Sequence, residues 1–228
     1  MHRRAVLRNG LALGGTAVAS AILGVGGPVS AAPASSSSPA PGPYGSLEGR
    51  RPDGNGLVLP EGFSSRIVAV GGTGVGATDY TWPLFPDGKG TVATPDGGWI
   101  LACNHEVFDF QTIGESAGGA SSIRFDSGGS ILDAYPILEG SHSNSRGATT
   151  PWGTWLSCQE AHQGDGRVWE CDPTGGSPPV PRNALGVRTH GSVAVDPVGG
   201  HCYLTEAHRD GRLYRFTMLA GSASGAAL

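Results

Sequence analysis

The chain has 228 residues and a formal net charge of −4, from 15 basic and 19 acidic side chains. This acidic balance argues against nucleic acid as the main partner and favours the binding of cations. Glycine accounts for 39 residues and hydrophobic residues for 38%, and five Trp and five Tyr are available for burial. The composition therefore excludes a disordered chain and indicates a loop-rich β protein.

Residues 1–32 have the pattern of an export signal. Arg3 and Arg4 open a basic head, residues 11–29 are uncharged and rich in Gly and Ala, and small residues at 29–31 offer a cleavage site. Paired arginines before a weakly apolar stretch favour the twin-arginine route. We expect a secreted, periplasmic or cell-surface protein that meets the membrane only through this signal. An uncleaved membrane anchor is the alternative, for which the Gly content is unfavourable.

Residues 33–43 form a linker rich in Pro, Ser and Ala, and residues 44–228 are long enough for one hydrophobic core. Four cysteines in an exported protein suggest disulfides. However, Cys103 and Cys158 occupy equivalent places in successive repeats, which would hold them too far apart to be joined. A twin-arginine substrate also folds in the reducing cytoplasm. Buried free thiols are therefore the favoured interpretation.

Three imperfect copies of one phrase organise the rest of the chain. Each copy joins a turn rich in Pro and Gly to a short apolar strand that ends on a polar tip, and the copies are residues 94–106, 149–160 and 196–206. Each continues into a second predicted strand, at 121–126, 167–171 and 212–216, and a further strand is expected at 65–70. Short strands that repeat with a period near 50 indicate blades of a β-propeller, so we expect an all-β fold.

Three glutamates, Glu106, Glu160 and Glu206, stand at the tips of the three copies. If the copies are blades, these side chains share one topological position and point toward a common axis. Hard cations such as Ca²⁺ take several oxygen ligands at once, so the pattern predicts a metal site. Asn104 and His105 could add ligands beside Glu106, although a histidine at such a tip is more often structural. Ordinary solvent-exposed strand ends are the alternative interpretation.

Several ordered motifs between Gly42 and Phe216 resemble the PhoX-type alkaline phosphatase family, including the phrase Thr-Pro-Trp-Gly-Thr-Trp at 150–155. The others are residues 42–47, 53–63, 166–175 and 193–197. The resemblance implies a six-bladed propeller whose channel holds iron and calcium ions and which hydrolyses phosphate monoesters. Family members are longer, so this chain is expected to form about three to four blades. A truncated gene product is one interpretation of that difference.

Several presumed metal ligands of the family are replaced in this chain. Where relatives carry an iron-binding Cys, this chain has Ser145, and Arg146 follows it. Gln159, Gly191 and Ala207 stand where the family has carboxylates. A serine hydroxyl is a far poorer ligand for iron than a thiolate. The remaining candidate ligands are Glu106, Glu160, Glu206, His190 and Asn104, and no catalytic residue is assigned.

The resemblance implies an exported, metal-dependent phosphate monoester hydrolase, and the substitutions predict weak or absent activity. Calcium is expected ahead of iron, and phosphorylated small molecules are the expected substrates. Calcium alone can neutralise developing charge, but it does little to polarise the phosphoryl group or generate the nucleophile. The alternatives are a non-catalytic propeller module or fragment, with or without calcium, and a calcium-dependent propeller lactonase, against which the long motifs argue. Open blade edges also predict self-association.

Overall fold

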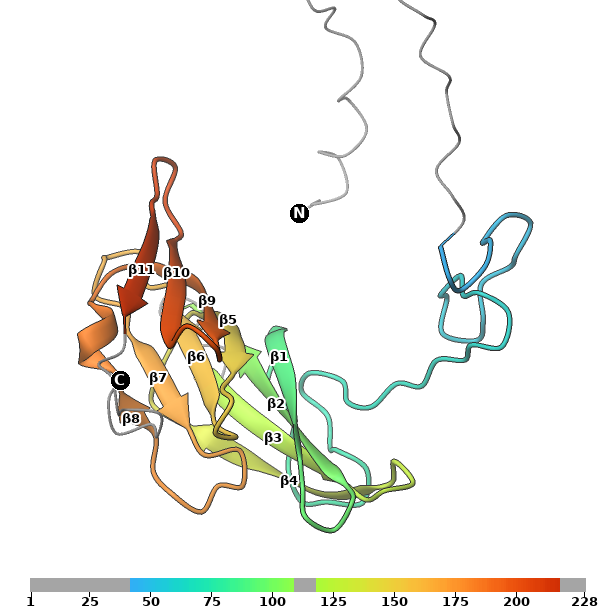
Figure 1. Cartoon of the computed structure of the whole chain (residues 1–228). Coiled ribbons are helices and arrows are strands. Elements are labelled where there is room, and N and C mark those ends of the chain that lie inside the picture. The colour runs from blue at the N-terminus through green and yellow to red at the C-terminus, as the bar shows by residue number, and fades with distance from the viewer. Residues whose placement is uncertain (1–41, 109–117, 218–228) are drawn as a thin grey trace, which may run out of the picture. The chain divides into compact units, whose positions relative to one another are not determined.

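The computed structural model describes residues 42–108 and 118–217 of the chain (Figure 1). The chain divides into two units, residues 1–49 and 50–228, and every strand belongs to the second. The described part of the first unit, 42–49, contains turns and no strand or helix. The expected export signal and all but residues 42 and 43 of the expected linker lie outside the described residues. The described residues include no helix with the length and apolarity needed to cross a membrane.

Three antiparallel sheets account for all the strands, and each strand pairs with its neighbours in the sequence. The first sheet contains β1 (Pro86–Ala93), β2 (Trp99–His105), β3 (Gly119–Phe125) and β4 (Ile131–Leu138). The second contains β5 (Asn144–Thr149), β6 (Trp155–Gln159), β7 (Val168–Cys171) and β8 (Val180–Pro181). The third contains β9 (His190–Asp196), β10 (His201–Glu206) and β11 (Leu213–Thr217). The described residues hold no α-helix, so the all-β expectation is confirmed.

The strands predicted after each repeated phrase are present. The stretches expected at 121–126, 167–171 and 212–216 correspond to β3, β7 and β11. The turns before β2 and β6 are closed in the same way, because Gly97 donates its amide hydrogen to Thr94 and Gly153 donates its own to Thr150, at 3.1 Å in both cases. Both glycines have a positive φ, of 83° and 87°, which glycine adopts at little cost.

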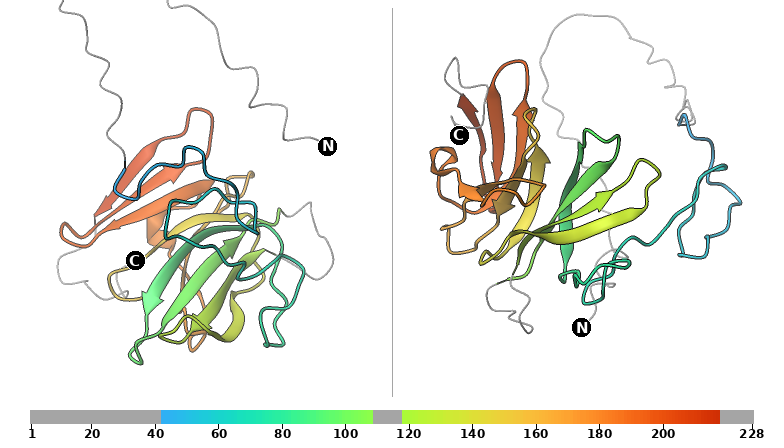
Figure 2. Two further views of the ribbon diagram at one scale, coloured as in Figure 1. Left: turned by 90° about the vertical axis from the view of Figure 1, so that its right-hand side faces the viewer. Right: turned by 90° about the horizontal axis from the view of Figure 1, so that it is seen from below.

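The first strands of the three sheets contact one another in chain order, β1 with β5 and β5 with β9. Figure 2 shows the sheets following each other from green to red. Backbones approach closely here, because a Cβ added to Gly88 would lie 2.6 Å from the carbonyl oxygen of Ser145. The indole of Trp155 in the second sheet packs against Gly90 of β1, where an added Cβ would lie 2.9 Å from its ring. Glycine at these positions therefore lets the sheets pack together.

Apolar side chains fill the spaces between neighbouring sheets. One cluster, which includes Leu156, Val193 and Leu204, lies between the second and third sheets. Another, centred on the fully buried Trp155, joins the first sheet to the second. A third covers the opposite face of the first sheet, where Val75 and Trp82 and their neighbours at 68–82 pack on β2, β3 and β4. The first sheet is thus covered on both faces.

The strand expected at 65–70 is not formed, which corrects that prediction. The segment Ser65–Val70 is free of turns but joins no strand ladder among the described residues. Val68 and Ala69 pack on the first sheet, whereas Ile67 is 63% exposed and Val70 51%. The β-branched sequence is suited to a strand, but a strand also needs a partner, and none lies beside it here.

The four cysteines Cys103, Cys158, Cys171 and Cys202 are all free and buried. The expectation of buried thiols is therefore confirmed. Burial raises the pKa of Cys103 and Cys202 to about 11 and that of Cys171 to about 12. These side chains behave as small apolar residues of the core.

Candidate functional site at the strand tips

The ladders of β1, β5 and β9 each contain a bulge close to the start of the strand. Their first residues, Pro86, Asn144 and His190, lie opposite His105, Gln159 and Glu206, and the register shifts by one residue immediately afterwards. Bulges re-aim side chains and are common beside functional sites. We call the three bulges, together with the residues that follow β2, β6 and β10, the tip site. It contains the residues that the sequence analysis selected.

The register corrects the predicted equivalence of the three glutamates. The amide of Glu106 donates to the carbonyl of Phe85 at 2.9 Å, and that of Glu160 donates to Ser143 at 2.7 Å. In the third sheet the corresponding bond is made by Ala207, which donates to Thr189 at 3.0 Å. Glu106 and Glu160 therefore share one position, while Glu206 lies one residue earlier. In the third sheet the equivalent position is occupied by Ala207, which has a methyl group instead of a carboxylate.

Phe85 and Ser143 hold the same strained conformation at equivalent places. Each precedes the first strand of its sheet, and their φ angles are 53° and 55°, in the left-handed region that residues other than glycine seldom adopt. The amide of Ser143 also donates to the carbonyl of Val107 at 2.7 Å, which links the second sheet to the loop after β2. Strain of this kind persists only where the surroundings enforce it, and it is concentrated at functional sites.

The loops that follow Glu106 and Glu160 contact each other. Phe108 and His162, each two residues after its glutamate, stack with ring centroids 5.5 Å apart and an interplanar angle of 19°. Both glutamates are partly buried, and they occupy equivalent positions in neighbouring sheets. The arrangement places two carboxylates at the start of two contacting loops.

Asn104 makes hydrogen bonds through both ends of its amide. It is completely buried, and its Nδ2 donates to the carbonyls of Ser145 and Arg146 at 3.0 and 3.1 Å. Its Oδ1 accepts a bond from Trp155 at 2.8 Å. These contacts connect the first and second sheets, so the structure gives Asn104 a clear structural task. Its predicted part as a metal ligand stays a prediction.

His190 and Asn144 present unpartnered acceptors in the interior of the tip site. The Nε2 of His190 lies 3.0 Å from the carbonyl of Gly186, so Nε2 carries the hydrogen and Nδ1 keeps its lone pair. Burial lowers the pKa of His190, which favours this neutral form. Neither His190 Nδ1 nor Asn144 Oδ1 has a hydrogen-bond partner among the described residues. Asn144 was not selected from the sequence, although its place directly before Ser145 could have indicated it.

Glu206 turns toward the outer strand of its own sheet. Its Oε2 accepts bonds from the hydroxyl of Tyr214 at 3.2 Å and from the amide of Arg212 at 3.4 Å. The carboxylate is therefore engaged within the third sheet.

The replaced residues are also engaged in hydrogen bonds within the protein. Ser145 is 1% exposed, and its hydroxyl donates to the carbonyl of Gly191 at 3.4 Å. The Oε1 of Gln159 accepts two bonds at 3.3 Å, from the amide of Arg167 and the indole of Trp169. A buried hydroxyl beside the exposed Arg146 does not suit iron, whose presumed ligand in relatives is a thiolate. Within 42–108 and 118–217 no three His, Cys, Asp or Glu side chains form a group that would hold a metal ion.

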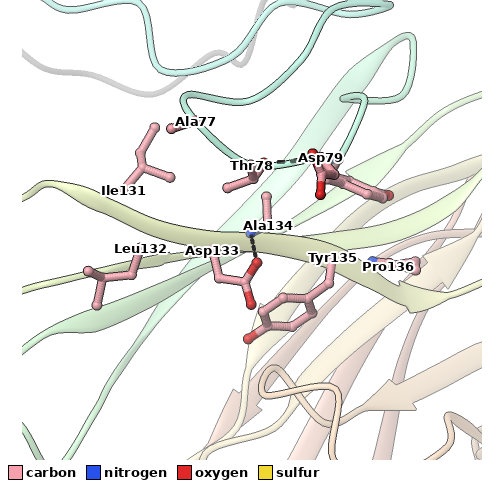
Figure 3. Close-up of a pocket in the computed structure, with 10 residues that line it drawn as sticks. Ala77, Thr78, Asp79, Ile131, Leu132, Asp133, Ala134, Tyr135 and Pro136 are labelled. Carbon is pink, nitrogen blue, oxygen red and sulfur yellow. Dashed lines mark hydrogen bonds between the residues drawn. The ribbon is translucent and has the colours of Figure 1, made fainter.

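A hollow of about 470 Å³ lies along β4, away from the residues selected from the sequence (Figure 3). Residues 77–80 form one side and 131–136 the other. Tyr80, at its wall, is hydrogen bonded to Ser121 at 2.7 Å, and Ser121 in turn to Nε2 of His105 at 3.0 Å. Burial lowers the pKa of His105 to about 4, so its ring is neutral. Nothing in the sequence indicated this hollow, because its two walls come from distant segments.

The fold and the tip site define an all-β protein of successive antiparallel sheets, with polar groups gathered where the first strands begin. Residues 117–225 match the family model of alkaline phosphatase PhoX. The match covers slightly less than half of the chain and includes β3 to β11. It confirms the resemblance to the PhoX family over these residues and indicates an alkaline phosphatase-like function. A search of the curated proteins finds no match.

Proposed function

We propose that this chain is an exported, propeller-type relative of the PhoX phosphatases whose phosphate monoester hydrolase activity is weak or absent. The family match supports the class of reaction. The observation that carries the reduced activity is the buried hydroxyl of Ser145, which bonds to Gly191 at the position of the family's iron-binding thiolate.

Three features support the propeller architecture. The first two sheets are four-stranded antiparallel meanders, as propeller blades usually are, and the third has the same order with three strands. The first strands contact one another from sheet to sheet. The bulge recurs at the same end of each first strand. Together these features support an arrangement in which the three sheets are consecutive blades and their first strands line one side of a channel.

The chemistry of the tip site supports the loss of activity. Hydrolysis of a phosphate monoester requires the phosphoryl oxygens to be polarised, the nucleophile positioned and developing charge neutralised. Ser145 and Gln159 are neutral and already bonded within the protein. Ala207 contributes no donor where Glu106 and Glu160 have carboxylates. Among the described residues, these groups can orient the backbone of the tip site and exclude water, but they supply no strong Lewis-acid centre of their own.

Calcium is the cation that we propose for the tip site, at Glu106 and Glu160. Both carboxylates are partly buried at equivalent positions, and oxygen ligands suit calcium. The unpartnered Oδ1 of Asn144 offers a further oxygen. Phosphorylated small molecules are the proposed substrates, and the twin-arginine signal would take the folded chain across the membrane.

Elemental analysis of the purified full chain, together with hydrolysis of a chromogenic phosphate monoester, tests this proposal. We expect calcium and little or no iron, with turnover close to that of buffer whether or not either metal is added. Stoichiometric iron together with turnover that chelator abolishes would overturn the reduced-activity proposal. A parallel assay with an aromatic lactone tests the lactonase alternative. That alternative requires calcium-dependent turnover of the lactone and no turnover of the phosphate ester.

A non-catalytic binding module is the second candidate, and it is favoured by the replacement of presumed ligands at Ser145, Gln159, Gly191 and Ala207. Titration calorimetry with a non-hydrolysable phosphonate distinguishes the two. Calcium-dependent binding without any turnover of the matched ester supports the module, whereas slow but saturable turnover supports the weak phosphatase.

A further inference from the structure

The outer edges of the three sheets differ in how well they are protected against pairing with another strand. β4 contains Pro136, and its ladder with β3 is interrupted twice, between Ala120 and Ser121 and between Arg124 and Phe125. β8 has only two residues, and one of them is Pro181. Proline, bulges and short length are the usual means of blunting an exposed edge. Two of the three outer edges are therefore protected.

The outer edge of β11 has none of these features. Its five residues, Leu213–Thr217, contain no proline and pair with β10 without a register shift. No described strand lies on its other side. The third sheet is also one strand shorter than the first two. An unprotected edge of this kind is suited to accept one more strand.

One face of the third sheet is open as well. Val193, Leu204 and Phe216 point toward the second sheet and belong to its apolar cluster. On the opposite face Tyr203 is 37% exposed and Leu213 71%. Tyr203 lies opposite Ala194 and Arg215 in the ladders, so these residues share that face. Apolar groups are thus exposed directly beside the open edge.

The segment Ser65–Val70 has the complementary properties. It contains no proline, and its exposed Ile67 and Val70 are β-branched residues suited to a strand. The Nη2 of Arg66 donates to the carbonyl of Gly129 at 2.8 Å, and Val68 packs on the first sheet. The segment is therefore held against the first sheet, extended and without a ladder partner among the described residues.

We infer that Ser65–Val70 adds as a fourth strand to the outer edge of β11 in a second copy of the chain. A second copy is the occupant because the second sheet lies between the first and the third, through contacts of β5 with both β1 and β9. The segment is anchored to the first sheet, so it does not reach β11 of its own chain. If the exchange is reciprocal, it gives a two-fold dimer. With the propeller arrangement proposed above, the dimer closes a ring of six sheets.

A mixing experiment with single cysteines tests the contact. One full-length chain carries Ile67→Cys and another carries Arg215→Cys, and the two are mixed under mild oxidation. The four native thiols are buried, so they contribute little background. We expect a covalent dimer that contains both chains, in roughly tenfold excess over a control pair with Val58→Cys in place of Ile67→Cys. Val58 is also exposed but lies outside the proposed strand.

Sedimentation of the unmodified chain gives the second readout. We expect twice the chain mass of 23.1 kDa, and monomer for Ile67→Pro, whose ring removes a backbone donor from the new ladder. Val58→Pro is the matched control and should stay dimeric. A monomeric wild-type chain with no mixed crosslink would overturn the inference. A chain with both cysteines that crosslinks only within itself would likewise overturn it. Neither readout depends on hydrolysis, so the phosphatase proposal stands or fails separately.

Discussion

The indole Nε1 of Trp155 donates a hydrogen bond to Oδ1 of Asn104 across 2.8 Å, and both side chains are completely buried. The same asparagine donates to the carbonyls of Ser145 and Arg146. One amide therefore connects β2, β5 and β6 and holds the bulge of β5 against the first sheet. The geometry of the tip site depends on this connection.

Replacement of Asn104 by Ala should destabilise the fold strongly. It removes a donor from the carbonyls of Ser145 and Arg146 and leaves the buried indole N–H of Trp155 without its acceptor, which we expect to cost about 3 kcal/mol. Urea denaturation followed by Trp fluorescence measures the change. Asn183→Ala, at an exposed asparagine whose side chain accepts a bond from Arg167 at 3.3 Å, is the control and should change stability little. Equal urea midpoints for the two variants would show that the hydrogen bonds of Asn104 add no stability beyond that of an exposed side-chain contact.

The carboxylate of Glu170 is the second buried polar centre, and it holds the turn before β6. Its Oε1 accepts bonds from Trp152 at 2.6 Å and Thr154 at 2.5 Å, and its Oε2 lies 2.6 Å from Nε of Arg182. We expect Arg182→Met to destabilise the protein by about 3 kcal/mol, because it leaves a buried charge without its counter-ion. Thermal unfolding measures this change. Arg124→Met, which breaks an exposed pair with Asp96, should have little effect.

Introducing a thiol at residue 145 tests whether Ser145 limits iron binding and the proposed activity. Ser145→Cys places a soft ligand in the bulge of β5, and we expect increased iron in the purified protein and faster ester hydrolysis. Absorption in the visible range, from thiolate bound to ferric iron, gives a readout independent of turnover. Ser122→Cys, at another fully buried serine, is the control. Iron content equal to that of the control would show that the missing thiolate is not the limiting defect.

The buried thiols should make the fold sensitive to alkaline pH. The pKa of Cys103 is raised from 9.0 to about 11, so the unfolded chain loses this proton at a lower pH than the folded chain. Stability is therefore expected to fall as the pH rises from about 9 to 11.

At pH 8 a thiol reagent should modify all four cysteines in denaturant and almost none in the native chain. Rapid native modification would contradict their burial.

The sequence predicted the features that depend on local chemistry. The Gly and Pro turns, the short apolar strands after them and the strands β3, β7 and β11 were all expected, because each is specified by neighbouring residues. The burial of the cysteines followed from the same repeats. The PhoX-like motifs were also identified from the sequence, since ordered motifs such as residues 150–155 can be recognised without tertiary information.

Only the tertiary structure decided which residues meet. At the starts of β1, β5 and β9 the strand pairing places Glu206 at the position of His105 and Gln159, so Ala207, and not Glu206, is level with Glu106 and Glu160. A shift of one residue changes which side chains share a position, and no pattern within a single strand reveals it. The strand predicted at Ser65–Val70 is wrong, because its β-branched sequence suits a strand but a strand also requires a partner distant in the chain. Local sequence determines what a segment can form, and long-range pairing determines whether it does.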